Sequence, residues 1–306
     1  MLSYNRLSKK PLLFKSFTGL SVQQFDNIYK EIKSKYEKYE IKRLSSKRNR
    51  ERDIGAGRHF KLFVEDRVIM VLVYYRLYIT YTMTEFLFGL DQSNVCRDIQ
   101  KIEGLIRPQC LPIPHKLYKI TKRLKTKEEV EQYFPAGFLA FIDTTEQPIP
   151  RPENRIRRKL YYSGKKKKHT VKNLYMINNE KTILYKTKHK QVGRRHDYKI
   201  YKENRPDTPK DVESIVDLGF LGVEKDYPEQ ISSLPIKKKK GNQDLTIEEK
   251  EYNRIHSKKR IVIEHAICRL KKYRIISEVF RNKLRKYDMV SDIVSGLVNY
   301  RIMNSI

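Results

Sequence analysis

The sequence of 306 residues contains no tryptophan and only three cysteines, Cys96, Cys110 and Cys268. The cysteines are far apart and match no zinc or redox spacing, so we expect buried thiols in a reducing compartment. The most apolar run, VIMVLVYY at 68–75, is far too short to span a bilayer. The apolar stretch at the basic N-terminus is too short for a signal peptide. These absences favour a soluble, intracellular protein.

Acidic residues are scarce relative to basic ones. Lys and Arg number 66 against 36 Asp and Glu, which gives a formal net charge of +30 and a pI near 9.9. Such an excess repels itself unless it meets a polyanion, so nucleic acid is the first partner to consider and a membrane surface the second. An AT-rich genome would also raise the content of Lys, Ile, Asn and Tyr. The positive charge is concentrated in particular segments, however, and this favours nucleic acid.

The segment 151–205 shows this concentration most clearly. It holds 19 Lys or Arg against four acids. Tyrosines lie among them, including Tyr161, Tyr162, Tyr175 and Tyr185. Basic residues interleaved with aromatic rings are typical of a groove that follows phosphates and stacks on frayed bases. A sheet edge protected by lysines would explain Lys165–Lys168, but not the bias of the whole segment.

Changes in pattern divide the chain into four regions. Residues 1–60 are expected to form a basic N-terminal arm with one helix, and residues 61–107 a compact helical unit. Residues 108–135 are expected to be a connector, because Pro108, Pro112 and Pro114 disfavour a helix at its start; a charged helix follows. Residues 136–306 show short alternating strands and then long helices, which predicts an α/β domain.

The region 61–107 has the pattern of a helix-turn-helix. A first helix at KLFVEDRVIMVLVYYRLY precedes TMTEFLFGL, where Thr82 and Glu85 predict a capping box and Gly89 a tight turn. The next helix has an apolar stripe of Val95, Ile99, Ile102 and Ile106. Its opposite face bears the residues that we expect to reach the major groove of DNA: Ser93, Asn94, Arg97 and Lys101. An ordinary three-helix bundle is the alternative interpretation.

Two aspartates follow short apolar runs in the second half of the chain. FIDTTEQPIP at 141–150 places Asp143 at the expected end of a strand, and DVESIVDLGFLG at 211–222 places Asp217 at the end of another. The two intervening strands, KLYYSGKKKKHTVKNLYMIN and KTILYKTKHKQ, read as a hairpin-like pair. If the strands that carry the aspartates are adjacent and parallel, the two carboxylates are neighbours at the edge where α/β sheets bind ligands.

A third acid, Glu264, lies on an expected helix. Arg260, Glu264 and Lys271 are four and seven residues apart, so they fall within roughly 40° of one another on one helix face. The neighbouring apolar stripe should dock on the sheet; it comprises Val262, Ile263, Ala266, Ile267 and Leu270. A surface ion pair between Arg260 and Glu264 is the alternative, but it does not explain why this row adjoins the apolar stripe.

Three clustered carboxylates raise one another's pKa unless a cation is present. Oxygen ligands with open positions suit Mg²⁺ or Mn²⁺. Two such ions about 3.5–4 Å apart can activate an attacking hydroxyl and stabilise the leaving oxygen of a phosphodiester. The acids therefore predict a site for two divalent ions that acts on nucleic acid.

The segments FIDTTEQPI, SIVDLGFLG and NRIHSKKRIVIEHAICRLKKYRII resemble, in order, the three acidic motifs of DDE transposases from bacterial insertion sequences. They are most similar to the branch whose endonuclease domain is shared with Harbinger-type elements, and the resemblance runs from about residue 60 to the C-terminus. It implies a ribonuclease-H-like α/β catalytic domain preceded by an all-α helix-turn-helix domain. It also implies that Asp143, Asp217 and Glu264 are the catalytic, metal-binding triad.

The resemblance extends to residues around the triad. Arg260 and Lys271 match basic positions that contact the transposon end, whereas Ser257 stands where the family often has a tyrosine. GRRHDYKIY at 193–201 resembles a Gly-x-x-His-Asp element of this branch, so Asp197 competes with Asp217 for the second metal position. A strand before Asp217 and a glycine after it favour Asp217, and Asp197 is then a residue at a helix N-terminus.

The function implied by this resemblance is that of a DNA transposase. It would use Mg²⁺ or Mn²⁺ to cleave DNA at the element's ends and then join them to target DNA, as a homodimer or larger assembly when it pairs two ends. It would act in the bacterial cytoplasm, on the nucleoid. Two alternatives remain: a catalytically inactive DNA-binding regulator derived from such an enzyme, and a stand-alone metal-dependent DNA endonuclease.

Overall fold

The computed structural model describes residues 1–46, 53, 56, 59–238 and 244–304. The chain divides into two compact units. The first comprises Met1–Leu111 with Tyr273–Ile275, and the second contains the rest of the described chain from Pro112 onward. In the described residues, no helix is long and apolar enough to cross a membrane.

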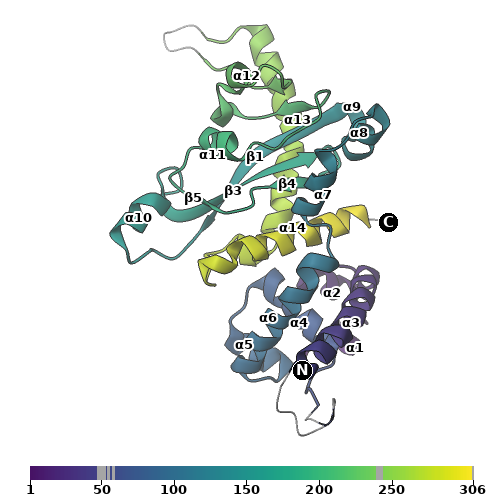
Figure 1. The fold of residues 1–306 in the computed structure, drawn as a ribbon. Helices are drawn as coiled ribbons and strands as arrows, with labels where there is room; N and C mark the ends of the chain where they lie inside the picture. Colours follow the sequence, from purple (N-terminus) through teal and green to yellow (C-terminus); the bar gives the residue numbers. More distant parts are fainter. Residues whose placement is uncertain (47–52, 54–55, 57–58, 239–243, 305–306) are drawn as a thin grey trace. The chain divides into compact units, whose positions relative to one another are not determined.

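The first unit is entirely helical in its described part (Figure 1). Its helices are α1 (Tyr4–Leu7), α2 (Pro11–Thr18), α3 (Val22–Ser45), α4 (Val64–Leu77), α5 (Tyr81–Phe88) and α6 (Gln92–Gln109). Helix α4 is the centre of the unit, because every residue from Val68 to Tyr75 is buried. The predicted stripe of α6 is buried as well, with Val95, Ile99 and Ile102 fully inaccessible and Ile106 nearly so.

The N-terminal region differs from the expected arm with one helix. Three helices precede residue 46, and they belong to the same compact unit as the helix-turn-helix. The reason is that short apolar patches in α2 and α3, with Phe14, Phe25 and Ile32 fully buried, supply part of the core. The predicted basic stretch near 43–58 lies largely outside the described residues.

The start of α5 corrects the predicted capping box. The N-cap is Thr80, whose side chain accepts a hydrogen bond from the amide of Met83. Thr82 lies inside the helix and instead accepts a bond from the Gln92 side chain. Helix α4 ends at Tyr78 in a left-handed conformation, so the link to α5 is short and the helix begins earlier than the sequence pattern indicated. Gly89 ends α5 with φ of 65°, as a tight turn requires.

The prolines of the expected connector interrupt helices less than predicted. Pro108 lies in the last turn of α6, and Pro114 opens α7 (Pro114–Thr121), where a missing N–H removes no helical bond. Helix α8 (Lys127–Tyr133) is the predicted charged helix and begins with a Thr126–Glu129 capping box. The short α9 (Pro135–Phe138) leads into the sheet.

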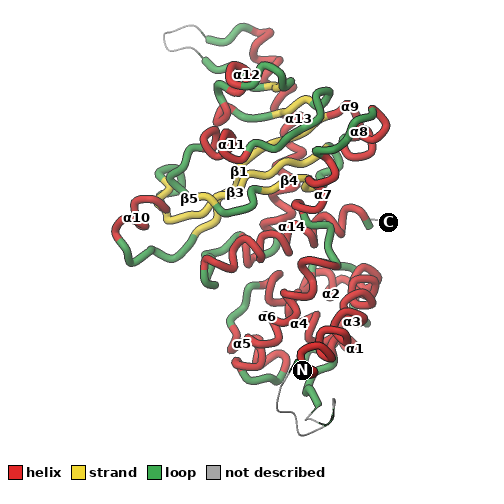
Figure 2. The backbone as a smooth tube through the Cα atoms, in the orientation of Figure 1, coloured by secondary structure: helices red, strands yellow, loops and turns green. Residues whose placement is uncertain are grey.

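The second unit is built on a mixed sheet (Figure 2). Its strands follow the order β2-β3-β1-β6-β7. The strands are β1 (Leu139–Pro148), β2 (Tyr162–Ser163), β3 (Lys168–Asn178), β4 (Ile183–Lys186), β5 (Gln191–Val192), β6 (Glu213–Ile215) and β7 (Ser232–Ser233). Strand β1 is antiparallel to β3 and parallel to β6, while β4 and β5 both pair with β3. The predicted hairpin is confirmed by the β3–β4 pairing, and β1 and β6 meet the condition of adjacent parallel strands under which the two aspartates become neighbours.

Asp143 lies in the middle of β1, not at its end as predicted. The strand continues to Pro148 because β3 supplies pairing partners along its whole length, with Asp143 opposite Tyr175. Alternate residues of β1 therefore face opposite sides of the sheet. Ala140 and Ile142 pack in a core cluster with Val130, Ile200 and other residues of α7, α8 and α11 (Asp197–Asn204).

The other side of the sheet is covered by the two long helices α13 (Ile247–Lys271) and α14 (Tyr287–Met303). Helix α13 begins with a Thr246–Glu249 capping box and buries Ile263, Ala266 and Leu270, as its apolar stripe predicted. The remaining helices are α10 (Arg155–Tyr161) and α12 (Val223–Asp226). The three cysteines form no disulfide; Cys110 is buried, but Cys96 is half-buried and Cys268 is exposed on α13, contrary to expectation.

Candidate functional site

The parallel pairing of β1 and β6 brings two carboxylates together. Phe141 is opposite Ile215, and Asp143 and Asp217 each lie two residues further along. The guanidinium of Arg260, on α13, donates a hydrogen bond to Asp143 Oδ2 at 3.3 Å and lies 3.9 Å from Asp217 Oδ2. The sequence prediction that these acids are neighbours is therefore confirmed, and a single cationic side chain links them.

Local backbone contacts fix both aspartates. Asp143 Oδ1 accepts a hydrogen bond from the amide of Thr144 at 2.7 Å. Asp217 caps a short 3-10 turn, and its Oδ1 accepts a bond from the amide of Gly219 at 2.8 Å. A Cβ on Gly219 would lie 2.8 Å from this same oxygen, so the close approach requires glycine. Each aspartate thus keeps its other oxygen directed toward Arg260.

The charges of this pair are not fully balanced. Burial, followed by the negative charge of Asp217, raises the pKa of Asp143 to about 6, although Arg260 and the amide of Thr144 act in the opposite direction. A carboxylate in this condition gains from any additional cation placed beside it. The pair therefore has the electrostatic character of a cation site.

Helix α13 presents the predicted row of charged residues toward β1 at both ends. Arg260 contacts the aspartates. At the other end, partial burial and the charge of Lys166 lower the pKa of Lys271, and the negative charges of Asp143 and Glu146 oppose this decrease. Because Arg260 binds the aspartates, the alternative of a plain surface pair between Arg260 and Glu264 is wrong.

Glu264 lies between Arg260 and Lys271 on this row, but its side chain is exposed. No described residue forms a hydrogen bond or ion pair with it. Within the described part of the chain, no three His, Cys, Asp or Glu side chains are already gathered as metal ligands. The structure thus brings Asp143 and Asp217 together. The third predicted acid, Glu264, lies at a distance of one helical turn from Arg260, which links the two aspartates.

A second charged cluster was not foreseen from the sequence. The ammonium group of Lys172, a buried residue of β3, donates to Asp197 Oδ1 at 3.0 Å and to the carbonyl of Arg195 at 2.9 Å, and lies 3.4 Å from Glu146 Oε1. Glu146 also accepts a bond from Thr170. Glu146 lies opposite Lys172 in the β1–β3 register, so only knowledge of that register could have revealed the cluster.

Asp197 is the first residue of α11, as predicted, and its main partner is Lys172. It still lies close to the aspartate pair: a Cβ on Gly219 would be 3.7 Å from Asp197 Oδ2, and the charge of Asp197 contributes to the raised pKa of Asp143. Asp217 rather than Asp197 shares the cation of Arg260 with Asp143.

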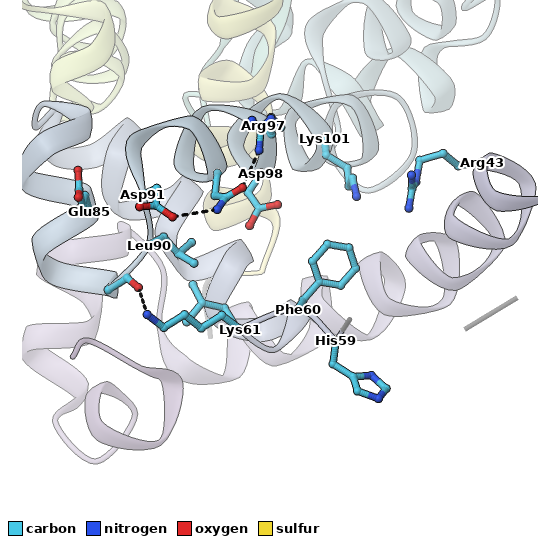
Figure 3. Close-up of a pocket in the computed structure, with 13 residues that line it drawn as sticks. Arg43, His59, Phe60, Lys61, Glu85, Leu90, Asp91, Arg97, Asp98 and Lys101 are labelled. Carbon is cyan, nitrogen blue, oxygen red and sulfur yellow. Dashed lines mark hydrogen bonds between the residues drawn. The ribbon is translucent and has the colours of Figure 1, made fainter. Parts of the chain in front are cut away.

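The predicted DNA-reading face of α6 is only partly free. Ser93, Asn94 and Arg97 are exposed, and Asn94 Oδ1 accepts a hydrogen bond from Arg97 at 2.7 Å. Lys101 instead forms an ion pair with Glu40 of α3 at 2.6 Å and lies 4.9 Å from the centre of the Phe60 ring. Figure 3 shows Lys101 pointing into a hollow of about 730 Å³ beside Phe60.

A helix-turn-helix unit is followed by a mixed sheet with one aspartate in β1 and another just after the parallel strand β6, an arrangement consistent with a ribonuclease-H-like α/β domain. Residues 142–299 match the DDE superfamily endonuclease family, and residues 60–108 match the helix-turn-helix of DDE superfamily endonucleases. The chain belongs to the DDE superfamily endonuclease family.

One relative covers nearly the whole chain. The "Probable transposase for insertion sequence element IS702" of Microchaete diplosiphon is 33% identical over 290 residues, which is 94% of each chain. No solved structure matches the chain.

Membership in this family implies the use of a divalent metal ion. The side chains at the site fit such an ion, because Asp143 and Asp217 offer only hard oxygen donors and the raised pKa of Asp143 shows that Arg260 does not fully neutralise the pair. The helix-turn-helix likewise implies DNA as the partner.

Proposed function

We propose that the protein is a DNA transposase that cleaves the ends of an insertion sequence and joins them to target DNA. The observation that carries this proposal is the pair of carboxylates formed by Asp143 in β1 and Asp217 just after the parallel strand β6, linked by Arg260. Family membership and the similarity to a protein named as a probable transposase support it. The high positive charge suits a protein that must hold DNA while it acts.

We assign the residues of the site as follows. Asp143 and Asp217 hold two divalent metal ions, either Mg²⁺ or Mn²⁺. Glu264, which lies on α13, completes the set of metal ligands. Such ions supply Lewis acidity at a phosphodiester and favour deprotonation of an attacking hydroxyl. Arg260 and Lys271, on either side of Glu264, contact the phosphates of the element's end. Lys172 holds Asp197 and Glu146 by ion pairs, and Asp197 lies close to the aspartate pair.

Cleavage and joining use the same arrangement of residues. In both steps an oxygen nucleophile displaces an oxygen of the DNA backbone, first a water and then the freed 3′-hydroxyl, so the same charges have to be stabilised. Pairing two ends of one element requires at least two copies of the protein. We therefore propose a homodimer or larger assembly on DNA.

The proposal is tested with DNA that carries the sequences flanking the gene, together with a target plasmid. We expect strand cleavage at the element's ends and joined products when Mg²⁺ is present, and neither when a chelator is added, while the DNA stays bound. Gel electrophoresis of the products separates the rival functions. Cleavage without joining would indicate a stand-alone endonuclease, and DNA binding with no reaction in Mg²⁺ or Mn²⁺ would indicate an inactive regulator; either result contradicts the proposal.

We propose that the exposed start of α6 reads the element's end. Arg97→Ala is expected to weaken binding to the element's end by about 1–3 kcal/mol and binding to unrelated DNA much less, because a base contact is lost rather than a phosphate contact. Fluorescence anisotropy with both DNAs measures the difference. Lys101→Ala should change specificity less, because Glu40 already binds Lys101. An equal loss on both DNAs for Arg97→Ala would show that Arg97 contacts phosphate only.

A further inference from the structure

The second unit contains a basic hollow well outside the carboxylate site. Its lining comes from the segment before α10, from α10, from β2 and Gly164, from the start of β3 and from the turn after β5. Of these elements, α10, β3 and β5 lie together in Figure 1. The hollow measures about 720 Å³, within the size range of small-ligand sites. The residues of interest are Arg151, Arg158, Lys159, Tyr162, His169 and Arg194. We call this hollow the α10 pocket.

The charge of the α10 pocket is of one sign. Four of its lining residues are Lys or Arg, and none is Asp or Glu. Among the described residues, no carboxylate forms an ion pair with any of these four cations. The guanidinium of Arg158 donates to the carbonyl of Glu153 at 2.7 Å, which positions this cation without neutralising it. Four unpaired cations around one hollow favour the binding of an anion.

The frame of the α10 pocket is fixed by backbone contacts. The amide of Gly193 donates to the carbonyl of Thr170, and the amide of Arg194 donates to the carbonyl of Leu160. A Cβ at Gly193 would lie 2.2 Å from Thr170 Oγ1 and 2.6 Å from the Tyr161 carbonyl, so the turn that carries Arg194 can approach β3 and α10 only with glycine there. The pocket is therefore formed before any ligand arrives.

Two rings lie together in the α10 pocket. Tyr162 and His169 are opposite each other in the β2–β3 register, and their ring centres are 5.7 Å apart in an edge-to-face arrangement. Tyr162 is 45% exposed, so a face of its ring remains open to a planar partner. A lysine-protected sheet edge would account for the positive charge, but not for an open ring within the hollow.

We propose that the α10 pocket binds one unpaired nucleotide of a DNA strand, with its phosphate held by the four cations and its base stacked on Tyr162. The base must be unpaired, because bases inside a duplex already have both faces covered. This inference rests on the proposed function for its DNA partner. The α10 pocket is then a second point of contact with that DNA. It lies about 20 Å along β1 from Asp143, a distance that corresponds to about six base-pair steps of DNA.

The position of the pocket follows from the strand register. His169 accepts a backbone hydrogen bond from Ile149, which lies six residues beyond Asp143 along β1 and its extension. A strand that is unpaired near the cleavage site could therefore reach the α10 pocket while the adjoining duplex remains next to the carboxylates.

The test compares two DNA probes with the full chain. One is a blunt duplex of about 30 base pairs, and the other is the same duplex with a single-stranded extension of about five nucleotides that contains 2-aminopurine. We expect tighter binding of the extended duplex and a decrease in 2-aminopurine fluorescence, because stacking quenches it. Tyr162→Ala should lower the affinity for the extended duplex about 5- to 150-fold, abolish the quenching and leave the blunt duplex unaffected. Tyr162→Phe should retain both properties.

The charged residues are tested with variants of equal net charge. Lys159→Gln combined with Arg194→Gln should lose the preference for the extended duplex. Arg157→Gln combined with Lys165→Gln removes two exposed cations from the same end of the unit, outside the pocket, and should keep that preference. Equal affinity of the original protein for both probes, or unchanged quenching in Tyr162→Ala, would refute the proposed role of the α10 pocket but would not contradict the transposase proposal. Failure to bind either probe would instead contradict the proposed function on which the pocket rests.

Discussion

Asp143→Asn is expected to lower the rate of Mg²⁺-dependent DNA cleavage at least about 1000-fold while DNA affinity stays the same. Asparagine keeps the shape of the side chain but removes one of the two negative charges that Arg260 links. Single-turnover cleavage of a labelled element end measures the rate, and anisotropy measures the affinity. Asp217→Asn and Glu264→Gln should behave in the same way if all three acids hold metal.

The matched control is Asp211→Asn, an exposed aspartate just before β6. It removes the same charge from the same region, and cleavage should proceed at the original rate. Normal cleavage by the Asp143, Asp217 or Glu264 variant would remove that residue from the proposed triad. For Glu264, whose side chain has no described partner, this experiment is the direct test of whether it joins the aspartates.

The same Asp143 substitution should stabilise the metal-free protein, which a simple packing defect would not do. The pKa of Asp143 is raised from 3.8 to about 6 in the folded chain. Below about pH 3 the carboxyl is neutral in both states, and above pH 6 its ionised form destabilises the folded state by about 3 kcal/mol. The gain from asparagine should therefore be present at about pH 7 and vanish at about pH 3. Urea unfolding with a chelator present measures it.

Lys172→Met is expected to lower the free energy of unfolding by about 3–5 kcal/mol. The ammonium group of Lys172 is buried between Glu146 and Asp197, and it also donates to the carbonyl of Arg195. Methionine fills similar volume but leaves two carboxylates without their cation, in a part of the protein where water cannot fully replace it. Urea or thermal unfolding measures the loss.

The control for this variant lies on the same strand. Lys168 is exposed at the start of β3, and Lys168→Met should change stability by less than about 0.5 kcal/mol. Adding Glu146→Gln and Asp197→Asn to Lys172→Met should recover part of the lost stability, because the unpaired charges are then removed as well. Equal small losses for Lys168→Met and Lys172→Met would show that the buried ion pairs contribute little.

The sequence was sufficient to predict the features that depend on local pattern. The period-two runs of β1 and β3 and the apolar stripes of α6 and α13 gave the correct elements. The parallel pairing of β1 and β6 was only a condition at that stage, and the structure supplies it. These predictions needed only hydrophobic periodicity and the known behaviour of α/β sheets.

The features that depend on contacts between distant residues could not be read from the sequence. The Lys172 cluster requires the β1–β3 register, and the pairing of Lys101 with Glu40 requires the position of α3. The one helix expected in residues 1–60 corresponds to α3, whereas α1 and α2 were missed because they are too short to show a helical period. The direction of the Glu264 side chain is also a property of the folded chain, since helical spacing fixes only the face of α13 from which it projects.

The placement of Asp143 inside β1 has a consequence for the way cations enter the site. Its neighbours Ile142 and Thr144 are both paired with β3, and Asp217 is held by the amide of Gly219, so neither backbone can shift without breaking these bonds. Arg260 is then the internal counter-ion of two immobile charges. Any external ion has to compete with this guanidinium, and removing it should make the site more receptive to metal even as it weakens the hold on DNA.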